Sequence, residues 1–597
     1  MKNIISKYQI VMLGLALSSL AGCKKYLDQV PNDRITIEQV FQKKGPSEQY
    51  LANVYNYVPD QGDQWGDQPW LGNADEADIT WSKYTIYNLN IGNISAGNAI
   101  FDKWDHYYQG IRSATYFMNH IGSNAEILAL NGQQLIDQYK AEARFLRAYF
   151  YFLLMQQYGP VVLAGEKEIP ADAKADAMQI PRSTYDSCVD YVSSELDKAA
   201  AVLPKIPSTN GQASDVQYGR ATVGMALAVK ARLLLYAASP LYNGNTELAG
   251  FKTKAGLPFI NQTYDAQKWK KAADAAKSVI DLGLYSLYHD AGNDPVKSYT
   301  GIFLQQWNSE QIFNRKSNSL PNFDVNAMPR IAGGWNGIAA TQEQVDAYFM
   351  TDGKPITESS MYSETGFTTV NGASVFNMYI SREPRFYASV IYNNCVWQGG
   401  KMQSAQPISF FASGPNGKSG HPTDWSKTGY LIRKNVAPQT NNGSGGNGTQ
   451  YARPLCLFRL GEVYLNYAEA LNEVDPNNPD ILKYLNLIRD RAGIPQYGSS
   501  ADIPVPGSQS DMRTRIWQER RVELAFEELR WFDIRRWKIA VQVMGNMHGM
   551  DINKNDNSFY TRVVASQHLF RPIASNWFPV SQYDMDRNKN YVQNPGW

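Results

Sequence analysis

The stretch QQLIDQYKAEARFLRAYFYFLLMQQY, residues 133–158, decides the fold of this chain of 597 residues. Its apolar residues recur three or four positions apart, which places them on one face of an α-helix; they are Leu135, Tyr139, Ala143, Leu146, Phe150 and Leu153. Gly159 and Pro160 follow directly, and a helix ends there because proline cannot continue it. The stretch therefore predicts one long helix with a buried face.

Several other segments share this spacing. In chain order, such helices are expected over 98–121, 133–158, 184–203 and 220–238, from Asp265 onward, around 463–474 and over 511–539. The first four form two neighbouring pairs, and paired antiparallel helices that bury their faces on the next pair are typical of a tetratricopeptide-like solenoid. The strict repeat signature is absent. We nevertheless predict a mostly α fold, built on a tetratricopeptide-like scaffold of helical pairs.

Two long stretches interrupt the helical pattern. Residues 59–97 and 291–451 are rich in Gly, Asn, Ser, Pro and aromatic residues. Irregular segments of this length inside a domain are usually functional or partly disordered. The glycine-rich tract at 441–448 lacks the spacing of a phosphate-binding loop. We therefore expect a loop-rich half that decorates the helical scaffold.

The N-terminus has the pattern of an export signal. Lys2 and Lys7 precede an apolar run over residues 10–20, which is too short to cross a bilayer about 30 Å thick. The run ends in Leu20-Ala21-Gly22-Cys23, which resembles a bacterial lipoprotein signal. That resemblance implies cleavage before Cys23 and acylation of the new N-terminus, by several chains because one chain binds a membrane weakly. The alternative is an ordinary signal peptide followed by a chance cysteine.

Composition excludes some functions. The 57 lysines and arginines nearly balance 56 acidic residues, without a dense basic run, so nucleic acid and polybasic membrane binding lack their usual driving force. No later segment has the roughly 20 apolar residues of a membrane-spanning helix.

The other cysteines, Cys188, Cys395 and Cys456, are widely spaced without CxxC. We expect them to be buried free thiols.

Short motifs occur along nearly the whole mature chain. In chain order they are CKKYLDQVP (23–31), AEARFLRAY (141–149), GRAT (219–222), ARL (231–233), RLGEVYLNYAEA (459–470), ERRVELAFE (519–527), RWFD (530–533) and QNPGW (593–597). Together they resemble the motifs of the SusD/RagB-like nutrient-binding outer-membrane lipoproteins.

The resemblance implies a fold with four tetratricopeptide-like units and a loop-rich half that carries the ligand surface. It implies a signal peptide (1–22), an N-terminal region with the helical repeats (23–240) and a C-terminal SusD/RagB region (241–597), which together form one compact unit. It also implies a lipoprotein anchored in the outer membrane through Cys23, facing the exterior, that delivers cargo to a TonB-dependent, SusC-like transporter. The usual cargo in the family is an oligosaccharide, and some members are thought to serve peptides.

Sugar binding calls for flat aromatic side chains with a few polar groups at the rim. Both irregular stretches supply this mixture. The best candidate is Trp335 with its neighbour Asn336 in Gly-Gly-Trp-Asn-Gly (333–337), because glycines often mark exposed loops. The further candidates are Trp65, Trp70, Asp75, Trp81, Tyr84 and Trp397. Core packing or contact with the transporter are the alternative interpretations.

Enzymatic motifs are absent. The six histidines show no HExxH or other paired metal spacing, no GxSxG occurs, and the turn from Asp551 fails the EF-hand pattern. Glu519, Glu523 and Glu527 are spaced for ion pairs on a helix surface. Two carboxylates suffice for a glycosidase, and those at 75, 76 and 78 are the first suspects. We expect a non-catalytic protein without cofactor, metal or nucleic acid, and structural calcium is unsupported; a peptide-binding protein and a surface glycosidase stay as alternatives.

Overall fold

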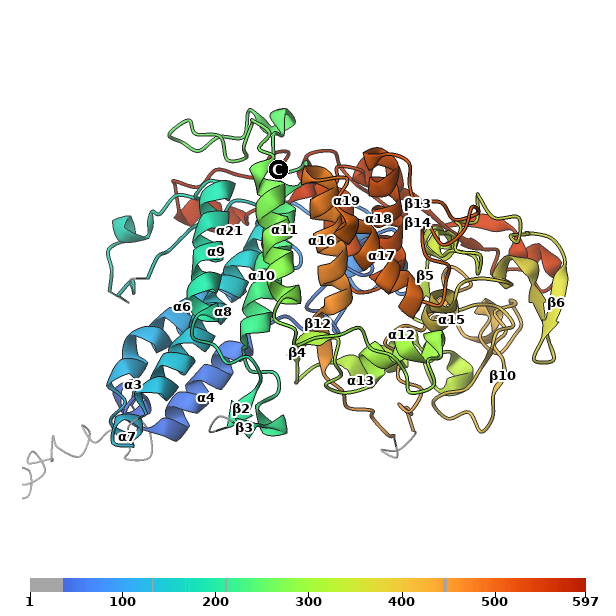
Figure 1. Cartoon of the computed structure of the whole chain (residues 1–597), viewed down its shortest axis with the longest axis horizontal. Helices are drawn as coiled ribbons and strands as arrows, with labels where there is room; N and C mark the ends of the chain where they lie inside the picture. The colour runs from blue at the N-terminus through green and yellow to red at the C-terminus, as the bar shows by residue number, and fades with distance from the viewer. Residues whose placement is uncertain (1–35, 131, 167, 171, 210–211, 444–447) are drawn as a thin grey trace, which may run out of the picture.

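Long helices packed side by side form the left half of the molecule in Figure 1. The computed structural model describes residues 36–130, 132–166, 168–170, 172–209, 212–443 and 448–597. Helix α6 (Trp104–His120) packs on α8 (Gln133–Tyr158), α8 on α9 (Tyr185–Ala200), and α9 on α10 (Val223–Ala238). The two predicted helical pairs are therefore confirmed.

The same row of helices continues with segments that are far apart in the chain. Helix α10 packs on α11 (Gln267–Ile280), and α11 packs on α16 (Leu460–Val474), which lies beside it in Figure 1. Helices α17 (Pro479–Arg491) and α18 (Gln509–Glu523) both contact α16. The contact between α11 and α16 joins the helical half of the chain to its C-terminal part.

Side-chain caps and a glycine fix the ends of the paired helices. The hydroxyl of Thr184 accepts a hydrogen bond from the backbone N–H of Ser187 and caps α9. Helix α8 ends at Gly159, whose φ of 74° lies in the region that favours glycine.

Short helices and seven two-stranded antiparallel sheets make up the other regular structure of the described residues. The paired strands are β1 (Ala77–Ile79) with β5 (Ile338–Ala340), β2 (Ser208–Thr209) with β3 (Gln212–Ala213), β4 (Gln311–Arg315) with β12 (Leu455–Arg459), β6 (Phe367–Val370) with β7 (Ala373–Phe376), β8 (Val390–Ile391) with β11 (Leu431–Ile432), β9 (Val396–Trp397) with β10 (Gln406–Pro407), and β13 (Gly545–Met550) with β14 (Arg562–His568). The remaining helices are α3 (Ile37–Val40), α4 (Lys44–Tyr55), α5 (Thr85–Asn90), α7 (Ala125–Leu128), α12 (Pro295–Leu304), α13 (Leu320–Ala327), α14 (Gln342–Ala347), α15 (Pro384–Ser389), α19 (Arg530–Arg536), α20 (Ala540–Val543) and α21 (Gln582–Arg587).

The single helix expected over 511–539 is wrong. Helix α18 ends at Glu523 and α19 starts at Arg530. Between them, Phe526 and Glu528 have φ values of 62° and 61°. Left-handed backbone at two such positions interrupts a right-handed helix, although the apolar spacing continues across the break.

The helix-surface ion pairs expected for Glu519, Glu523 and Glu527 are also wrong, because Glu519 and Glu523 are fully buried and their partners come from other elements. Glu523 accepts from Arg459 and Arg385 at 2.7 and 2.9 Å and also from Arg491. Burial raises the pKa of Glu523, but the positive charges of Arg491, Arg459 and Arg385 lower it by more than burial raises it. The pKa of Glu523 is therefore well below the usual range. This buried network joins α15, α17, α18 and β12.

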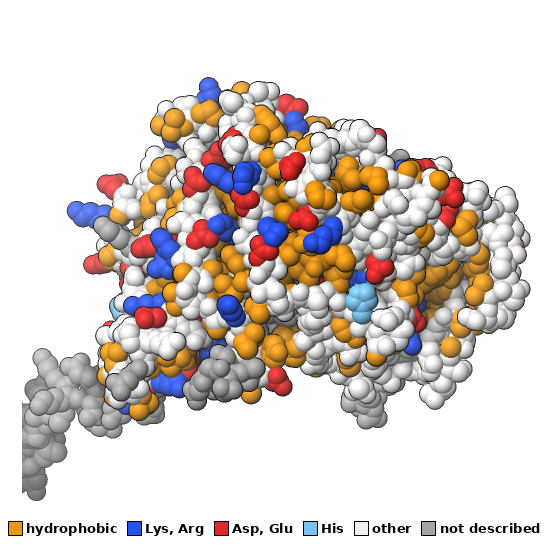
Figure 2. Space-filling model, viewed as in Figure 1, with side chains coloured by type: hydrophobic (Ala, Val, Ile, Leu, Met, Phe, Trp, Pro, Cys, Tyr) orange, Lys and Arg blue, Asp and Glu red, His pale blue; other side chains and the backbone are white. Residues whose placement is uncertain are grey.

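One cluster of buried apolar side chains runs from Phe41 to Val580 and includes residues from both the 36–240 and the 241–597 regions. On the face shown in Figure 2, basic and acidic side chains intermingle over the helical half, and fewer charges lie on the loop-rich half. No helix among the described residues is long and apolar enough to span a bilayer.

The described cysteines are free thiols, as predicted. Cys188 and Cys395 are buried, and Cys456 is half-buried rather than fully buried. Cys23 and the predicted signal peptide lie outside the described residues.

Candidate functional site

A short antiparallel sheet brings two of the predicted tryptophans together. Strand β1 pairs with β5 so that the end of β1 lies opposite the start of β5. Trp81 follows the end of β1, and Trp335 precedes the start of β5, so antiparallel pairing places both at the same end of the sheet. The backbone N–H of Thr80 donates to the carbonyl of Gly337 at 3.0 Å and extends the pairing toward them.

Four of the predicted residues form one aromatic cluster, which we define as Trp65, Trp81, Tyr84 and Trp335. The rings of Trp65 and Tyr84 stack with centroids 5.2 Å apart. The Trp81 ring meets those of Trp65 and Trp335 edge to face, each at 6.3 Å. Trp335 is 38% exposed and Trp81 only 7%, while Trp65 and Tyr84 are half-buried. The cluster therefore presents ring surface to solvent on a buried aromatic base.

The central ring of the cluster, Trp81, is held from two sides. Its indole N–H donates to Oδ1 of Asp424 at 3.0 Å. The other side of the ring lies directly on the backbone of Gly337, where even a methyl group would overlap the indole. Trp81 is thus a fixed base against which the more exposed Trp335 packs.

The loop that carries Trp335 is tied down through Asn336, which is fully buried and has a φ of 54°. The Asn336 amide donates to the carbonyl of Asn416 at 3.1 Å, and its oxygen accepts from the backbone N–H of Arg330 at 3.1 Å. The Arg330 guanidinium in turn donates to the carbonyl of Asp424 at 2.7 Å. Asn336, predicted to contact ligand, instead positions the loop.

Two predicted tryptophans lie inside the protein and not at the aromatic cluster. Trp70 is 6% exposed and packs against Phe532 and Phe578, with ring centroids 5.1 and 5.4 Å away. Trp397, also 6% exposed, belongs to strand β9. Their burial removes both from the surface that a ligand would reach, because packing accounts for most buried aromatic residues.

The suspected carboxylates at 75, 76 and 78 are buried as well. Asp75 forms ion pairs with Arg530 at 2.7 Å and Arg521 at 3.0 Å. Burial raises the pKa of Asp75, but Arg521 and Arg530 outweigh this effect and hold its pKa well below the usual range. Asp75 is therefore a structural ion-pair partner and not a rim group for a sugar.

Two features of the site were missed in the sequence. Lys83 places its ammonium group 5.1 Å from the Tyr84 ring centroid and 5.9 Å from that of Trp81. It lies in the same loop as Trp81, so its proximity was readable from the sequence. The contact between Trp81 and Asp424 was not, because 343 positions separate the two residues.

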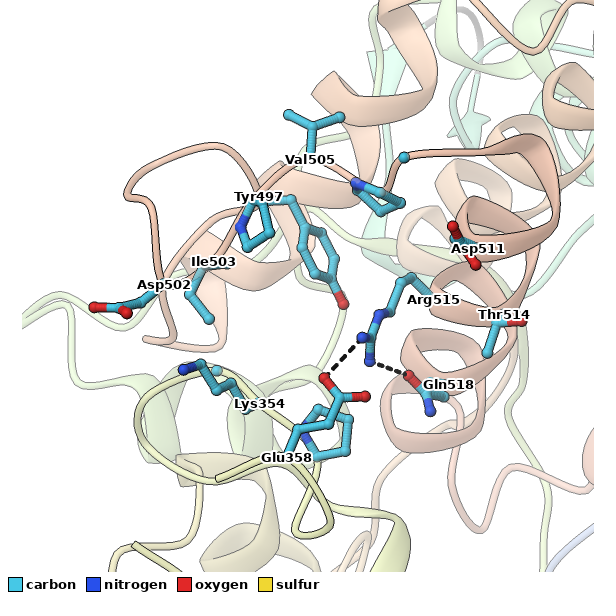
Figure 3. A pocket seen from close by; sticks show the side chains of 15 residues that line it. Lys354, Glu358, Tyr497, Asp502, Ile503, Val505, Asp511, Thr514, Arg515 and Gln518 are labelled. Atoms are coloured by element: carbon cyan, nitrogen blue, oxygen red, sulfur yellow. Dashed lines mark hydrogen bonds and ion pairs between the residues drawn. The ribbon is translucent and has the colours of Figure 1, made fainter. Parts of the chain in front are cut away.

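A separate pocket of about 440 Å³ lies between the 353–358 loop, the 497–507 turn and α18 (Figure 3). The Tyr497 hydroxyl points inward, and Arg515 bridges Glu358 at 2.7 Å and Gln518 at 3.1 Å. Because charges of both signs line the pocket, they favour no particular class of ligand. It shares no residue with the aromatic cluster.

The described part of the chain contains no group of three or more His, Cys, Asp or Glu side chains arranged to hold a metal ion. At the turn that begins like a calcium loop, the Asp551 carboxylate accepts from the backbone N–H of Asn553 at 3.1 Å. This is the contact of an ordinary Asx turn.

Comparison with known protein families identifies the family of this chain. A family model described as the SusD family matches residues 299–597, half of the chain. The chain belongs to the SusD family. A second family model, described as "Starch-binding associating with outer membrane", matches residues 25–235. The family resemblance and the mostly helical fold predicted from the sequence are therefore confirmed.

One relative within the SusD family covers nearly the whole chain at low identity, and another covers a short part of it at higher identity. The SusD-like protein P38 of Formosa agariphila is 22% identical over 565 residues, which cover 92% of this chain and 94% of that protein. The SusD-like protein P2 of the same organism is 38% identical over 106 residues, only 17% of this chain and 20% of that protein.

Solved structures from the SusD family superpose over most of the chain. A SusD-like protein from Bacteroides fragilis has a TM-score of 0.74 at 25% identity, covering 95% of this chain and all of that chain. A laminarin-binding SusD-like protein has a TM-score of 0.56 at 17% identity and covers 93% of this chain and all of its own.

Proposed function

We propose that this protein binds oligosaccharides at the aromatic cluster and delivers them to a partner TonB-dependent transporter. The observation that carries the proposal is the meeting of Trp65, Trp81, Tyr84 and Trp335 at one end of the β1–β5 sheet. The C–H faces of a sugar ring bury apolar area against such rings, while its hydroxyl groups stay at the polar rim. The structural likeness to a laminarin-binding SusD-like protein adds support.

We further propose that acylation at Cys23 anchors the protein in the outer membrane, facing the exterior. The lipoprotein-like signal over residues 1–23 supports this, as does the description of the family model that matches 25–235. Anchoring beside the transporter raises the local concentration of captured ligand, so modest affinity suffices for delivery. The protein acts without catalysis in this proposal.

The test replaces Trp335 by alanine and measures oligosaccharide binding by calorimetry. At 38% exposure Trp335 contributes ring surface with little loss of core packing, so Trp335→Ala should weaken binding roughly tenfold and leave the Tm near that of wild type. Trp81→Ala should weaken binding as well, because Trp335 packs against the Trp81 ring. Because Trp81 is largely buried, that variant should also lose about 3 kcal/mol or more of stability.

The matched control is Trp307→Ala, which removes a half-buried tryptophan stacked on Tyr218 away from the cluster. It should bind oligosaccharide as wild type does. Unchanged affinity in Trp335→Ala would reject the aromatic cluster as the site. Recovery of bound peptides without sugars from native membranes would favour the peptide alternative, and release of reducing ends from glycans would favour the glycosidase alternative.

A further inference from the structure

The segments of Trp81 and Trp335 carry no acidic residues, whereas the segment of Trp65 carries Asp60, Asp63 and Asp67. Between Glu383 and Glu462, Asp424 is the single acidic residue among eight lysines and arginines. Residues 79–101, which contain Trp81, and 325–342, which contain Trp335, have no Asp or Glu. Five of these eight basic residues form ion pairs with carboxylates from other parts of the chain: Arg385, Lys427, Lys434, Arg453 and Arg459. Among the described residues, Lys401, Lys418 and Arg433 have no such partner.

Three exposed lysines lie on segments around the cluster, and one of them, Lys83, contacts its rings directly. Lys83 lies over the rings of Tyr84 and Trp81 at 5.1 and 5.9 Å. Lys418 lies 5.0 Å from the ring centroid of Trp425, the residue after Asp424. The stem of Lys401 passes 3.5 Å from where a Cβ on Gly333 would lie, two residues before Trp335.

The neighbouring carboxylates do not neutralise these lysines. Asp424 accepts from the Trp81 indole at 3.0 Å and from the Thr423 hydroxyl at 2.9 Å. Its second oxygen lies 3.5 Å from His421. Asp63, near Trp65, accepts from backbone N–H groups. Within the described residues, Lys83, Lys401 and Lys418 form no ion pair.

The half-buried Arg330 adds a further positive charge beside the loops. The Arg330 guanidinium donates to the carbonyls of Asp424, Pro415 and Gly417 at 2.7, 2.7 and 2.8 Å and contacts no carboxylate among the described residues. A cation bonded only to neutral carbonyls keeps its net charge. Asp424 and Asp63, which accept from neutral donors, keep their negative charge in the same way. Lys83, Lys401, Lys418 and Arg330 outnumber these two carboxylates, so the surroundings of the cluster carry a net positive charge.

We propose that the oligosaccharide held at the aromatic cluster is acidic and carries carboxylate or sulfate groups. This inference rests on the proposed glycan-binding function and narrows its ligand class. The aromatic rings take the apolar face of a sugar, and the exposed ammonium groups of Lys83, Lys401 and Lys418 meet acidic substituents at the rim. Because such exposed pairs are screened by salt, affinity for the acidic glycan falls as ionic strength rises.

The test measures binding of the full chain in detergent to matched glycan pairs that differ only in charge. One pair is an oligogalacturonide and its methyl ester; the others are sulfated galactan and sulfated laminarin oligosaccharides with their desulfated forms. The acidic member should bind roughly tenfold more tightly at low salt, and the advantage should shrink at high salt. The oligogalacturonide pair tests recognition of carboxylate groups, and the sulfated pairs test recognition of sulfate groups.

Variants separate charge from stacking. Replacing Lys83 and Lys418 together by glutamine should weaken binding of the acidic glycan roughly threefold to tenfold and leave the neutral member unchanged. The control Lys271→Gln, which removes an exposed lysine of α11, should bind both members as wild type does. Loss of neutral-glycan binding in the Lys83, Lys418 variant would indicate a damaged cluster and count against a charge role.

Two negative results are distinguishable. If neutral and acidic members bind equally and the lysine variant matches wild type, the acidic-ligand inference is overturned while glycan binding at the cluster stands. If no member of any pair binds to wild type, the proposed glycan-binding function is overturned together with this inference.

Discussion

At the scale of single residues, Gly337 decides whether Trp81 can take its place in the aromatic cluster. A Cβ at this position would overlap the Trp81 indole, so Gly337→Ala must displace the ring or the β5 backbone. Overpacking of this kind costs about 1–3 kcal/mol. We expect the variant to lose oligosaccharide affinity at least roughly tenfold, because the ring on which Trp335 packs has moved.

Calorimetric binding and thermal unfolding of Gly337→Ala check this expectation. The control is Gly250→Ala, since no atom lies within 4 Å of the Cβ that it would add. Wild-type affinity in Gly337→Ala would show that the position of Trp81 is not needed for binding.

Residue type and loop composition were enough to predict the four residues of the aromatic cluster. They could not show which of the predicted site residues lie at the surface and which lie in the interior. Trp65, Trp81, Tyr84 and Trp335 come together as side chains from one kind of segment. Trp70, Asp75, Asn336 and Trp397 come from the same segments, yet they are buried. Their burial depends on long-range partners, such as Arg530 for Asp75, that no local pattern reveals.

At the scale of elements, strand β1 is joined to the break between α18 and α19 by Glu76. Its Oε2 accepts from the backbone N–H of Phe526 at 2.9 Å, and its Oε1 has no partner among the described residues. Burial raises the pKa of Glu76 to about 8; the Phe526 N–H opposes this effect and Asp75 adds to it. The carboxyl is therefore protonated when folded at neutral pH.

This raised pKa predicts a loss of stability with rising pH. Between the unfolded value of about 4.5 and the folded value of about 8, the folded protein holds a proton that the unfolded chain has released. The free energy of unfolding should therefore fall across this window, by up to about 1.4 kcal/mol per pH unit from this group. Glu76→Gln removes the titration, so its stability curve should be flatter than that of wild type.

Urea unfolding of wild type and Glu76→Gln at several pH values between roughly 5 and 8 measures the effect, because this range lies between the unfolded and folded pKa values. The exposed Glu247, which pairs with Lys538 on the surface, supplies the control Glu247→Gln. Parallel curves for wild type and Glu76→Gln would contradict the assignment.

The long helices followed from apolar periodicity, although α8 is buried on all sides over most of residues 145–158 and not on one face alone. The break between α18 and α19 could not be predicted, since apolar residues at Val522, Phe526 and Leu529 keep helical spacing across it. The left-handed backbone at Phe526 and Glu528 leaves no trace in that spacing. The contact between α11 and α16 was equally hidden, because it joins distant segments.

At the scale of the whole molecule, the proposed lipid anchor makes a direct prediction. Cys23→Ser removes the thiol that would be acylated, and without several acyl chains the protein has no durable hold on a membrane. We expect the variant to move from the membrane fraction to the soluble fraction while keeping its affinity for oligosaccharide. Fractionation with mass spectrometry of the mature N-terminus checks this, and a variant that stays with the membrane would contradict the anchor.

The aromatic cluster joins residues that are synthesised far apart: Trp81 meets Asp424 across 343 positions, and Thr80 meets Asn336 across 256. Such distant contacts close late in folding, because the loop between them must be ordered first. With the export and glycan binding proposed above, a polypeptide in transit would lack the aromatic cluster until the segment around Asp424 has followed. Cargo recognition would then begin only once that segment is in place, so a partly exported chain would not sequester nutrient.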